Sequence, residues 1–309
     1  MKLLTFKSDN KILLGFQIKD YIFQVDTAYK YFFNKPTPVW INDMRSLLEY
    51  GESGLEQIES LVEKTKRFLS KTKDQIKLKN LKILHSIKEV KIMAPIINPE
   101  KIICIGLNYR DHCTEQNIQL PKRPILFSKF STALIGYGDN IVRPLLTKKL
   151  DFEGELAFII GKQGKNIHQE EAMQYIAGYS IFHDVSARDI QFADRQWLRG
   201  KTFDTFAPMG PILVTKDEIE NPHNLNIKVM VNETIMQNSN TKNMIFDIPY
   251  LVNFISQVVP LSPGDIVSTG TPSGVGVFRK PQVFLKEGDE VVINIEKLGV
   301  LRNRVVDEK

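Results

Sequence analysis

Long apolar runs and cysteines are scarce in this chain of 309 residues, and each scarcity excludes a class of protein. The longest apolar stretches, such as residues 102–107, fall far short of the roughly 20 residues that a membrane-spanning helix needs. The two cysteines, Cys104 and Cys113, are too few for the disulfide framework of a small secreted protein. We therefore expect a protein of a reducing compartment with no membrane partner.

The first residues carry no visible targeting segment. "MKLLTFKSDNKILLGF" alternates apolar and polar residues as a strand does. It lacks the small-residue cleavage site of a signal peptide and the Arg- and Ser-rich, acid-poor character of a transit peptide. We expect a cytoplasmic protein, or a protein of the mitochondrial matrix whose presequence is missing from this chain.

Several familiar catalytic motifs are absent as well. No G-x-S-x-G occurs, which excludes a nucleophile elbow, and the five histidines and two cysteines show no zinc-site spacing. The glycine-rich stretch "GDIVSTGTPSGVG", residues 264–276, is not followed by the G-K-[ST] of a phosphate loop. Arg279 stands where a dinucleotide motif would need its third glycine, so that motif fails too.

Excess charge of one sign is confined to one segment. The formal net charge is +5, but residues 64–91 hold ten Lys and Arg against two Asp and Glu, which leaves the rest of the chain slightly acidic. This segment has one aromatic residue, Phe68, and no known nucleic-acid-binding motif. A solvated basic face or a connector explains it better, and we expect no nucleic-acid partner.

The order of predicted elements indicates two unequal parts. Residues 1–33 are expected to form short strands, and a Ser53–Glu56 capping box followed by apolar residues at helical spacing predicts a helix over 54–71. The residue composition changes at residues 92–96, where prolines and short apolar stretches begin. We therefore expect a small N-terminal domain with a basic connector over residues 1–92 and a catalytic domain over residues 93–309.

Strands dominate the second part. They are expected at residues 102–105, 125–128, 156–160, 181–183, 227–231, 266–269 and 290–295, with a final hairpin turning at 297–299 and short helices at 169–177 and 248–258. Strands outnumber helices without a βαβ alternation, which argues against a doubly wound sheet. The expected fold class is α+β, mostly β.

Three acidic residues alternate along "LDFEGELAFIIG", residues 150–161. In a strand Asp151, Glu153 and Glu155 would share one face, where like charges repel. A wet face, pairing with arginines, or a bound divalent cation would each remove the conflict. Oxygen-only ligands select a hard ion such as Mg²⁺, Mn²⁺ or Ca²⁺ rather than zinc, and a third ligand would come from elsewhere.

Other polar residues could complete a site, and each has an ordinary alternative. Asp184 follows an apolar strand and could be a ligand or a helix cap. His112 and Glu115 would face one side of a helical turn, as a general-base pair or as an idle surface pair. Lys201, in a stretch flanked by glycine and proline, could bind an anion or be a surface charge.

Together these pieces resemble the fumarylacetoacetate hydrolase family, from about residue 96 to the end. The carriers of the resemblance, in order along the chain, are "CIGLNYRDHCTEQN", "PILFSKFSTALIG", "DFEGELAFIIGK", "HDVSARDIQ", "LRGKTFDTFAPMGP" and "GDIVSTGTPSGVG". The N-terminal section and "GVGVFRKPQVFLKEGDEV" look closest to the domain-containing protein 2 subgroup. The resemblance implies a mixed β-sandwich roll with a smaller N-terminal α/β domain, assembled as a homodimer.

The resemblance also implies a role for each residue of the site. The metal ligands are Glu153, Glu155 and Asp184, the catalytic residues are His112, Glu115 and Lys201, and the substrate-binding residues are Lys129, Arg188, Gln191 and Thr271. The metal would be Mg²⁺ or Mn²⁺, with Ca²⁺ possible in vitro, and Asp151 would be a supporting group or a neighbour in solvent. Gly154 departs from the family, which has a bulkier residue between the glutamates; it would face away from the metal.

Family substrates are 2-oxo acids and β-dicarbonyl acids, and such a site supports three reactions. Proton shuttling gives keto–enol tautomerisation, loss of carbon dioxide gives decarboxylation, and water activation gives C–C hydrolysis. The subgroup resemblance favours an oxaloacetate keto–enol tautomerase. The alternatives are an acylpyruvate or fumarylpyruvate-type hydrolase, an oxaloacetate decarboxylase, and a non-catalytic metal-binding protein of the same fold.

Overall fold

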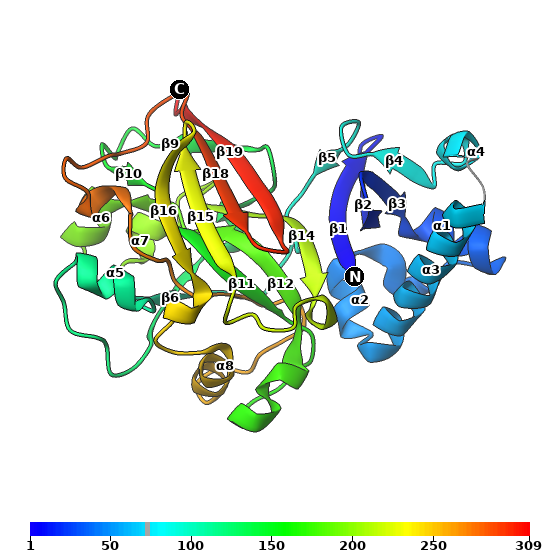
Figure 1. Ribbon diagram of the computed structural model, residues 1–309, viewed down its shortest axis with the longest axis horizontal. Coiled ribbons are helices and arrows are strands. Elements are labelled where there is room, and N and C mark those ends of the chain that lie inside the picture. The colour runs from blue at the N-terminus through cyan, green and yellow to red at the C-terminus, as the bar shows by residue number, and fades with distance from the viewer. Residues whose placement is uncertain (72–74) are drawn as a thin grey trace.

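A large mixed sheet connects the two ends of the molecule (Figure 1). The computed structural model describes residues 1–71 and 75–309. The strands of the large sheet lie in the order β4 (Leu84–Ser86), β3 (Tyr21–Gln24), β2 (Lys11–Ile18), β1 (Lys2–Ser8), β14 (Ala207–Thr215), β12 (Ile176–His183), β11 (Gly154–Ile160), β17 (Ile266–Ser268), β6 (Ile102–Gly106) and β7 (Ile125–Lys129). β5 (Lys91–Ile92) pairs with β1, and β8 (Leu134–Ile135) pairs with β14.

Two smaller sheets complete the strand structure. One has the order β16 (Thr234–Asn240), β15 (Asn226–Val231), β18 (Glu290–Ile295), β19 (Gly299–Asp307) and β9 (Asn140–Arg143), and the other pairs β10 (Leu150–Asp151) with β13 (Ser186–Ala187). The five-stranded sheet packs on the large one, since Val229 and Ile293 belong to the same buried apolar cluster as Leu156 and Ile181. The functional residues described below stand at one end of this packed pair.

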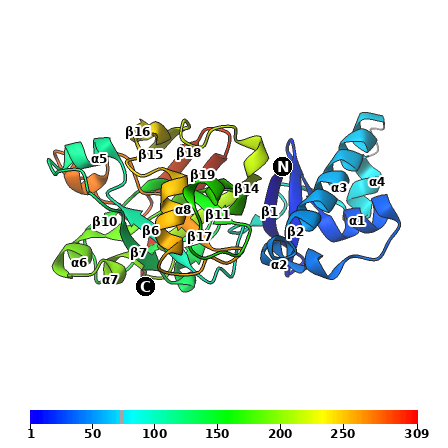
Figure 2. The same cartoon turned by 90° about the horizontal axis from the view of Figure 1, so that it is seen from below.

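Helices occupy the N-terminal lobe and the edges of the sheets. They are α1 (Val25–Phe33), α2 (Met44–Glu49), α3 (Glu52–Lys71), α4 (Gln75–Asn80), α5 (Arg110–Glu115), α6 (Arg188–Ala193), α7 (Leu198–Lys201) and α8 (Ile248–Ser256). Short 3-10 turns lie at Val39–Asn42, Ser131–Ala133, Gln169–Tyr175, Lys216–Glu218, Thr241–Asn243 and Gly276–Phe278. Figure 2 shows α8 lying across the strands of the large sheet. Within the described part of the chain, no helix combines the length and apolar character needed to cross a membrane.

Most of the predicted elements are present, with two exceptions. The helix predicted over 54–71 is confirmed by α3, and the strands predicted after residue 100 are confirmed as well. Residues 25–33 form α1 rather than a strand, because Val25, Ala28 and Tyr29 recur at helical spacing and are buried. The helix predicted over 169–177 is a 3-10 helix that ends at Tyr175, where β12 follows.

The architecture as a whole is mixed α/β, so the description "mostly β" was wrong. Four helices, α1 to α4, gather with β1 to β4 in the N-terminal lobe (Figure 1). The basic segment 64–91 covers the end of α3, α4 and β4, and its residues 72–74 lie outside the described residues. Because β1 pairs with β14, the large sheet continues across the predicted domain boundary, which stays a prediction.

The strand predicted to carry the three acids is interrupted. Leu150 and Asp151 pair with β13, whereas Gly154 begins β11 in the large sheet, and Phe152 and Glu153 belong to neither. Gly154 does face away from the carboxylates, toward the five-stranded sheet. A Cβ placed there would lie 2.4 Å from a methyl carbon of Val229, so packing between the two sheets explains this departure from the family.

Candidate functional site

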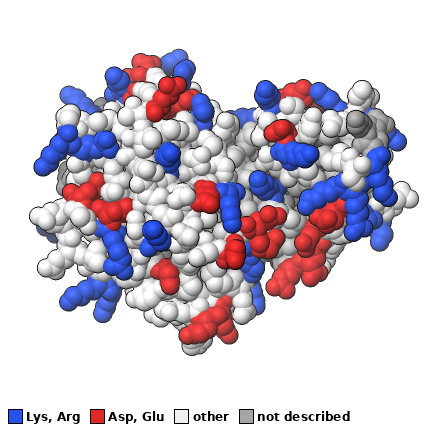
Figure 3. Space-filling view, in the orientation of Figure 1, with Lys and Arg blue, Asp and Glu red and all other residues white. Residues whose placement is uncertain are grey.

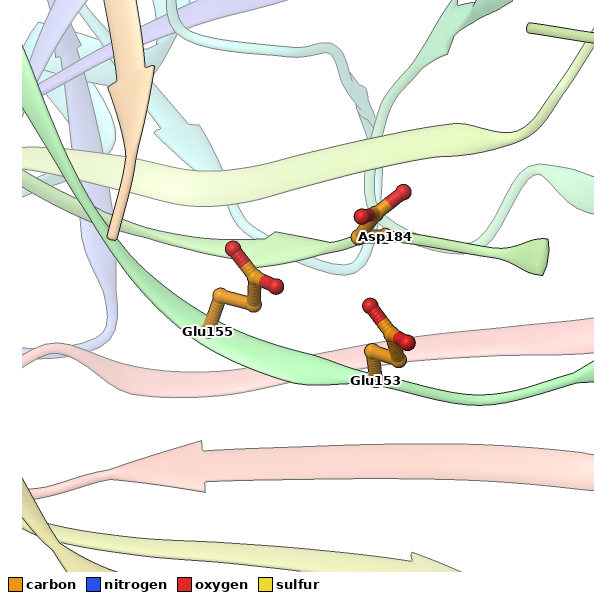
Figure 4. A group of neighbouring side chains, drawn as sticks. All are labelled: Glu153, Glu155 and Asp184. Carbon is orange, nitrogen blue, oxygen red and sulfur yellow. The ribbon is translucent and has the colours of Figure 1, made fainter. Parts of the chain in front are cut away.

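Three carboxylates meet at the end of the large sheet (Figure 4). Glu153 and Glu155 flank the start of β11, and Asp184 follows β12. They meet because β11 and β12 are antiparallel neighbours in which Gly154 stands opposite His183. One oxygen atom of each carboxylate lies within 4.8 Å of the others, and all three residues are buried. Neither the wet face nor the helix cap considered for these acids is present.

Two buried cations hold Glu153 and Asp184. Lys201 Nζ donates to Glu153 Oε2 at 2.8 Å and to Asp184 Oδ2 at 2.7 Å, and an Arg188 nitrogen lies 2.6 Å from Glu153 Oε1. Burial raises the pKa of Glu153, but Arg188 and Lys201 outweigh burial and hold that pKa below its ordinary value. Burial likewise lowers the pKa of Lys201, and the two carboxylates more than reverse this. Glu153 and Lys201 are therefore charged at neutral pH.

Glu155 is held by neutral donors instead. Its Oε2 accepts hydrogen bonds from the Ser268 hydroxyl, at a short distance of 2.5 Å, and from the Gly270 N–H at 2.9 Å. Burial, then repulsion from Asp184 and Glu153, raises the pKa of Glu155 well above its ordinary value. A cation placed among the three carboxylates would relieve that repulsion.

The composition and charge of this group fit a hard divalent ion. All three candidate ligands are carboxylate oxygens, which Mg²⁺, Mn²⁺ and Ca²⁺ prefer, and their mutual distances allow one ion to reach all three. Counting Asp151, four buried acids face three buried bases, the latter being Lys129, Lys201 and Arg188. With Glu155 ionised, the group would carry an excess of one negative charge, which a bound cation would offset.

Asp151 has a defined supporting place, and the alternative that it is a neighbour in solvent was wrong. Its side chain is fully buried, and its Oδ2 accepts from Arg188 Nε at 2.8 Å. Its two oxygens also accept from the N–H groups of Gly276, at 2.7 Å, and Val277, at 3.0 Å. Asp151 therefore ties Arg188, which binds Glu153, to the loop after β17.

Lys129 lies behind Asp184 rather than in the cleft. Its Nζ donates to the carbonyl oxygens of Val185, Phe206 and Lys201, and it lies 2.7 Å from Asp184 Oδ1. Burial lowers the pKa of Lys129 from its ordinary value, against the opposing effect of Asp184. The substrate contact predicted for Lys129 stays a prediction, and its visible contacts position Asp184.

His112 and Glu115 form a close pair on α5. His112 Nδ1 lies 2.6 Å from Glu115 Oε1, as expected for residues three apart on a helix. Glu115 also accepts, through Oε2, the N–H of Gly274 at 2.8 Å. Gly274 has φ +104°, and a Cβ there would lie 2.2 Å from the Met236 carbonyl oxygen, so this contact depends on glycine. The idle surface pair considered for His112 and Glu115 does not describe this arrangement.

His112 of the pair and two of the carboxylates, Glu153 and Glu155, line one cleft of about 50 Å³, whereas Glu115 and Asp184 stand behind its walls. Of the predicted site residues, those on its walls are His112, Glu153, Glu155, Arg188, Gln191, Lys201 and Thr271. Gln191 Oε1 accepts from Arg188, and the Thr271 hydroxyl donates to the Gly154 carbonyl oxygen and accepts from Gln237. The sequence interpretation missed the aromatic walls, formed by Phe127, Phe192, Trp197 and Phe278. Phe278 lies only two residues beyond the glycine-rich stretch of residues 264–276. Its nearness to that stretch was the signal in the sequence that could have placed it at the site.

Comparison with known proteins gives concordant matches. A family model described as "Fumarylacetoacetate (FAA) hydrolase C-terminal" matches residues 101–306. The Xenopus laevis protein named oxaloacetate tautomerase fahd2, mitochondrial, is 50% identical over 265 residues, which make up 85% of this chain and 78% of that protein.

Solved structures agree over the full length. The fumarylacetoacetate hydrolase of Exiguobacterium antarcticum is 30% identical with a TM-score of 0.80, and the maleylpyruvate hydrolase of Sphingobium sp. SYK-6 is 29% identical with a TM-score of 0.75. Each comparison covers 100% of both chains.

Proposed function

Since the chain belongs to the fumarylacetoacetate hydrolase family, we propose that it is a metal-dependent enzyme that interconverts the keto and enol forms of oxaloacetate. The observation that carries the proposal is one cleft lined by His112, which is paired with Glu115, and by Glu153 and Glu155, which form a buried carboxylate triad with Asp184. The substrate follows from the name of the Xenopus laevis relative, at 50% identity.

The chain's own residues supply proton transfer. His112 takes a proton from the carbon beside the substrate carbonyl, or returns one, while Glu115 fixes the ring through Nδ1. A divalent ion, held by Glu153, Glu155 and Asp184, would polarise the carbonyl and stabilise the negative charge on its oxygen. Lys201 and Arg188 keep Glu153 ionised, and the narrow aromatic walls limit water around the reacting carbon.

Four finer assignments belong to the same proposal. The ion is Mg²⁺ or Mn²⁺, and Lys129 positions Asp184, while Arg188, Gln191 and Thr271 contact the substrate. The protein works in the mitochondrial matrix, and the word mitochondrial in the name of its Xenopus laevis relative supports a mitochondrial location. The fold is a β-sandwich roll with the smaller N-terminal domain.

We also infer a homodimer. Strand β7 stands at the end of the large sheet, with Ile125, Leu126 and Phe130 exposed along it. Such an apolar strand edge is a surface that a second copy could cover. Light scattering at two protein concentrations would give twice the chain mass, and a single-chain mass at both would contradict it.

C–C hydrolysis is the second candidate, because the structural similarity to maleylpyruvate hydrolase points to it. Both reactions use the same cleft, and they differ in whether water reaches the carbonyl.

The test uses purified protein with enol oxaloacetate, with Mg²⁺ and then with chelator. Loss of enol absorbance and appearance of pyruvate are followed in parallel. Fast, metal-dependent enol loss without pyruvate is expected. Equal formation of pyruvate would indicate decarboxylation, and no effect on either signal would reject oxaloacetate. Acylpyruvates would then be assayed, where cleavage would favour the hydrolase and no reaction would favour a non-catalytic binding protein.

A further inference from the structure

Two aromatic rings stand over the catalytic dyad. The ring centroid of Phe278 lies 6.0 Å from that of His112 and 6.5 Å from that of Phe192. Both phenylalanines line the cleft, yet neither is a core residue: Phe192 is 56% exposed and Phe278 is partly exposed. Both side chains are large, apolar and partly exposed at the mouth of a polar cleft. Core packing does not explain this position, which indicates another role.

Both rings stand on segments that are tied to Asp151. Phe192 belongs to α6, which begins at Arg188, and Arg188 Nε binds Asp151 Oδ2. Phe278 ends the 3-10 turn that starts at Gly276, whose N–H binds Asp151 Oδ1. The separation of the rings is therefore set by one buried carboxylate, not by the rings themselves.

The loop that carries Phe278 is braced on its other side as well. Arg279 donates to the carbonyl oxygens of Met236, at 3.0 Å, and Gly274, at 3.3 Å. The N–H of Gly274 is in turn held by Glu115. A ring on a segment fixed at both ends cannot move aside at low cost, so it limits what can occupy the space next to His112.

We propose that Phe192 and Phe278 form a size-selective rim that admits short 2-oxo diacids and excludes 2-oxo acids with a bulky substituent beside the carbonyl. The inference rests on the proposed function, because it assigns the substrate class of the same cleft. A rigid apolar wall discriminates by volume: one methylene too many changes the specificity ratio about 10- to 200-fold.

The experiment compares two enols that are followed by their absorbance, oxaloacetate as the short substrate and phenylpyruvate as the bulky one, with the Mg²⁺-loaded protein. The variants are Phe278→Ala, Phe192→Ala and the double variant. Tyr50→Ala is the matched control, since Tyr50 is 52% exposed and lies outside the cleft. The kcat/KM for phenylpyruvate relative to oxaloacetate should rise at least about tenfold in the first three and stay unchanged in the control.

A second variant and a second readout make the result decisive. Phe278→Leu preserves the apolar contact with a smaller side chain and should give an intermediate shift, even if Phe278→Ala folds poorly. Calorimetric titration with phenylpyruvate measures binding without turnover, and its Kd should fall in Phe278→Ala.

The outcomes separate the rim from the proposed activity. If the wild type does not react with oxaloacetate, yet Phe278→Ala tightens phenylpyruvate binding, the proposed function fails and the rim is supported. A ratio that stays within about twofold of the wild type in folded variants would overturn the rim. A wild type that uses phenylpyruvate as well as oxaloacetate would overturn it too.

Discussion

The catalytic cleft and the outer face of the N-terminal lobe are both rich in charge, but they use it in opposite ways. Around the cleft, the side chains of Lys129 and Lys201 are 0% and 2% exposed, and each lies against Asp184. On the lobe, blue side chains gather at the outer end in Figure 3, and the Lys66–Glu63 pair is half exposed on both sides. Burial and pairing, rather than the number of charges, mark the functional region.

The largest expected effect tests the cleft directly. His112→Ala should lower turnover of oxaloacetate by about 10²- to 10⁴-fold, because general-base catalysis typically contributes that much. The Kd for Mg²⁺ should stay nearly unchanged, since His112 is not among the candidate ligands. His168→Ala is the control, because His168 is exposed and lies outside the cleft. Wild-type turnover in His112→Ala would show that His112 and Glu115 are not the catalytic pair.

The next effect concerns stability. Asp151→Asn should lower the free energy of unfolding by about 3–5 kcal/mol, because it removes one of the two carboxylates that hold the buried Arg188 and leaves Glu153 as the other. Denaturant unfolding measures the change. Asp194→Asn removes the partner of the exposed Arg199 and should change stability far less. Equal losses of unfolding free energy in the two variants would show that burial does not make the Asp151–Arg188 pair more important for stability than the exposed pair.

Metal affinity is the third test. Glu153→Gln and Asp184→Asn should each weaken binding of Mg²⁺ or Mn²⁺ by at least about tenfold. Loss of a residue that hydrogen-bonds a metal ligand typically lowers metal affinity by that much, and loss of a ligand itself should lower it no less. Calorimetric titration of the folded variants measures this, and Asp307→Asn, far from the triad in the Arg143 pair, is the control. Unchanged affinity in both cleft variants would remove these carboxylates as ligands.

A smaller effect depends on pH. Burial lowers the pKa of His223, whose Nε2 accepts the N–H of Ile248 at 3.1 Å. The unfolded chain therefore binds a proton at this histidine more readily than the folded one. Stability should fall as the pH drops below the ordinary histidine value of about 6.5, until the lower folded pKa is reached. In denaturant unfolding, His223→Gln should reduce this slope and His168→Gln should not; identical slopes would contradict the assignment.

The smallest effect is expected on the N-terminal lobe. Lys66→Gln and Arg67→Gln should leave oxaloacetate turnover at the wild-type level, because exposed charges on α3 are screened and far from the cleft in sequence and fold. A gel-shift assay with nucleic acid should show no binding at physiological salt. A complex whose affinity fell steeply with salt would instead assign a partner to this face.

The sequence predicted the site better than it predicted the supporting structure. The residues brought together from motifs, such as Glu153, Glu155 and His112, do line one cleft, because a strand end and a short helix place them locally. For Asp151 the sequence left a supporting role and a place in solvent open, because the chain leaves one sheet and enters another at Phe152. Such a change of sheet depends on packing that no local pattern contains.

Other failures had a local cause. The periodicity of α1 was present in the sequence but was obscured by a run of aromatic and β-branched residues typical of strands. The place of Phe192 could not be predicted, because α6 meets the loop of Phe278 only through Asp151. Tertiary contacts across more than 100 residues decide that meeting.

The hydrogen bond from Gly274 to Glu115 has a kinetic consequence. One carboxylate oxygen of Glu115 contacts His112, and the other accepts a hydrogen bond from the loop that carries Phe278. Glu115 therefore links the histidine to that loop. If α5 swings away to admit a substrate, His112 and Glu115 move together, so the hydrogen bond from Gly274 breaks and the histidine leaves the carboxylates as the cleft opens. The enzyme would thus be idle whenever it is open to bulk water, and proton abstraction would begin only after the entrance has shut behind the substrate.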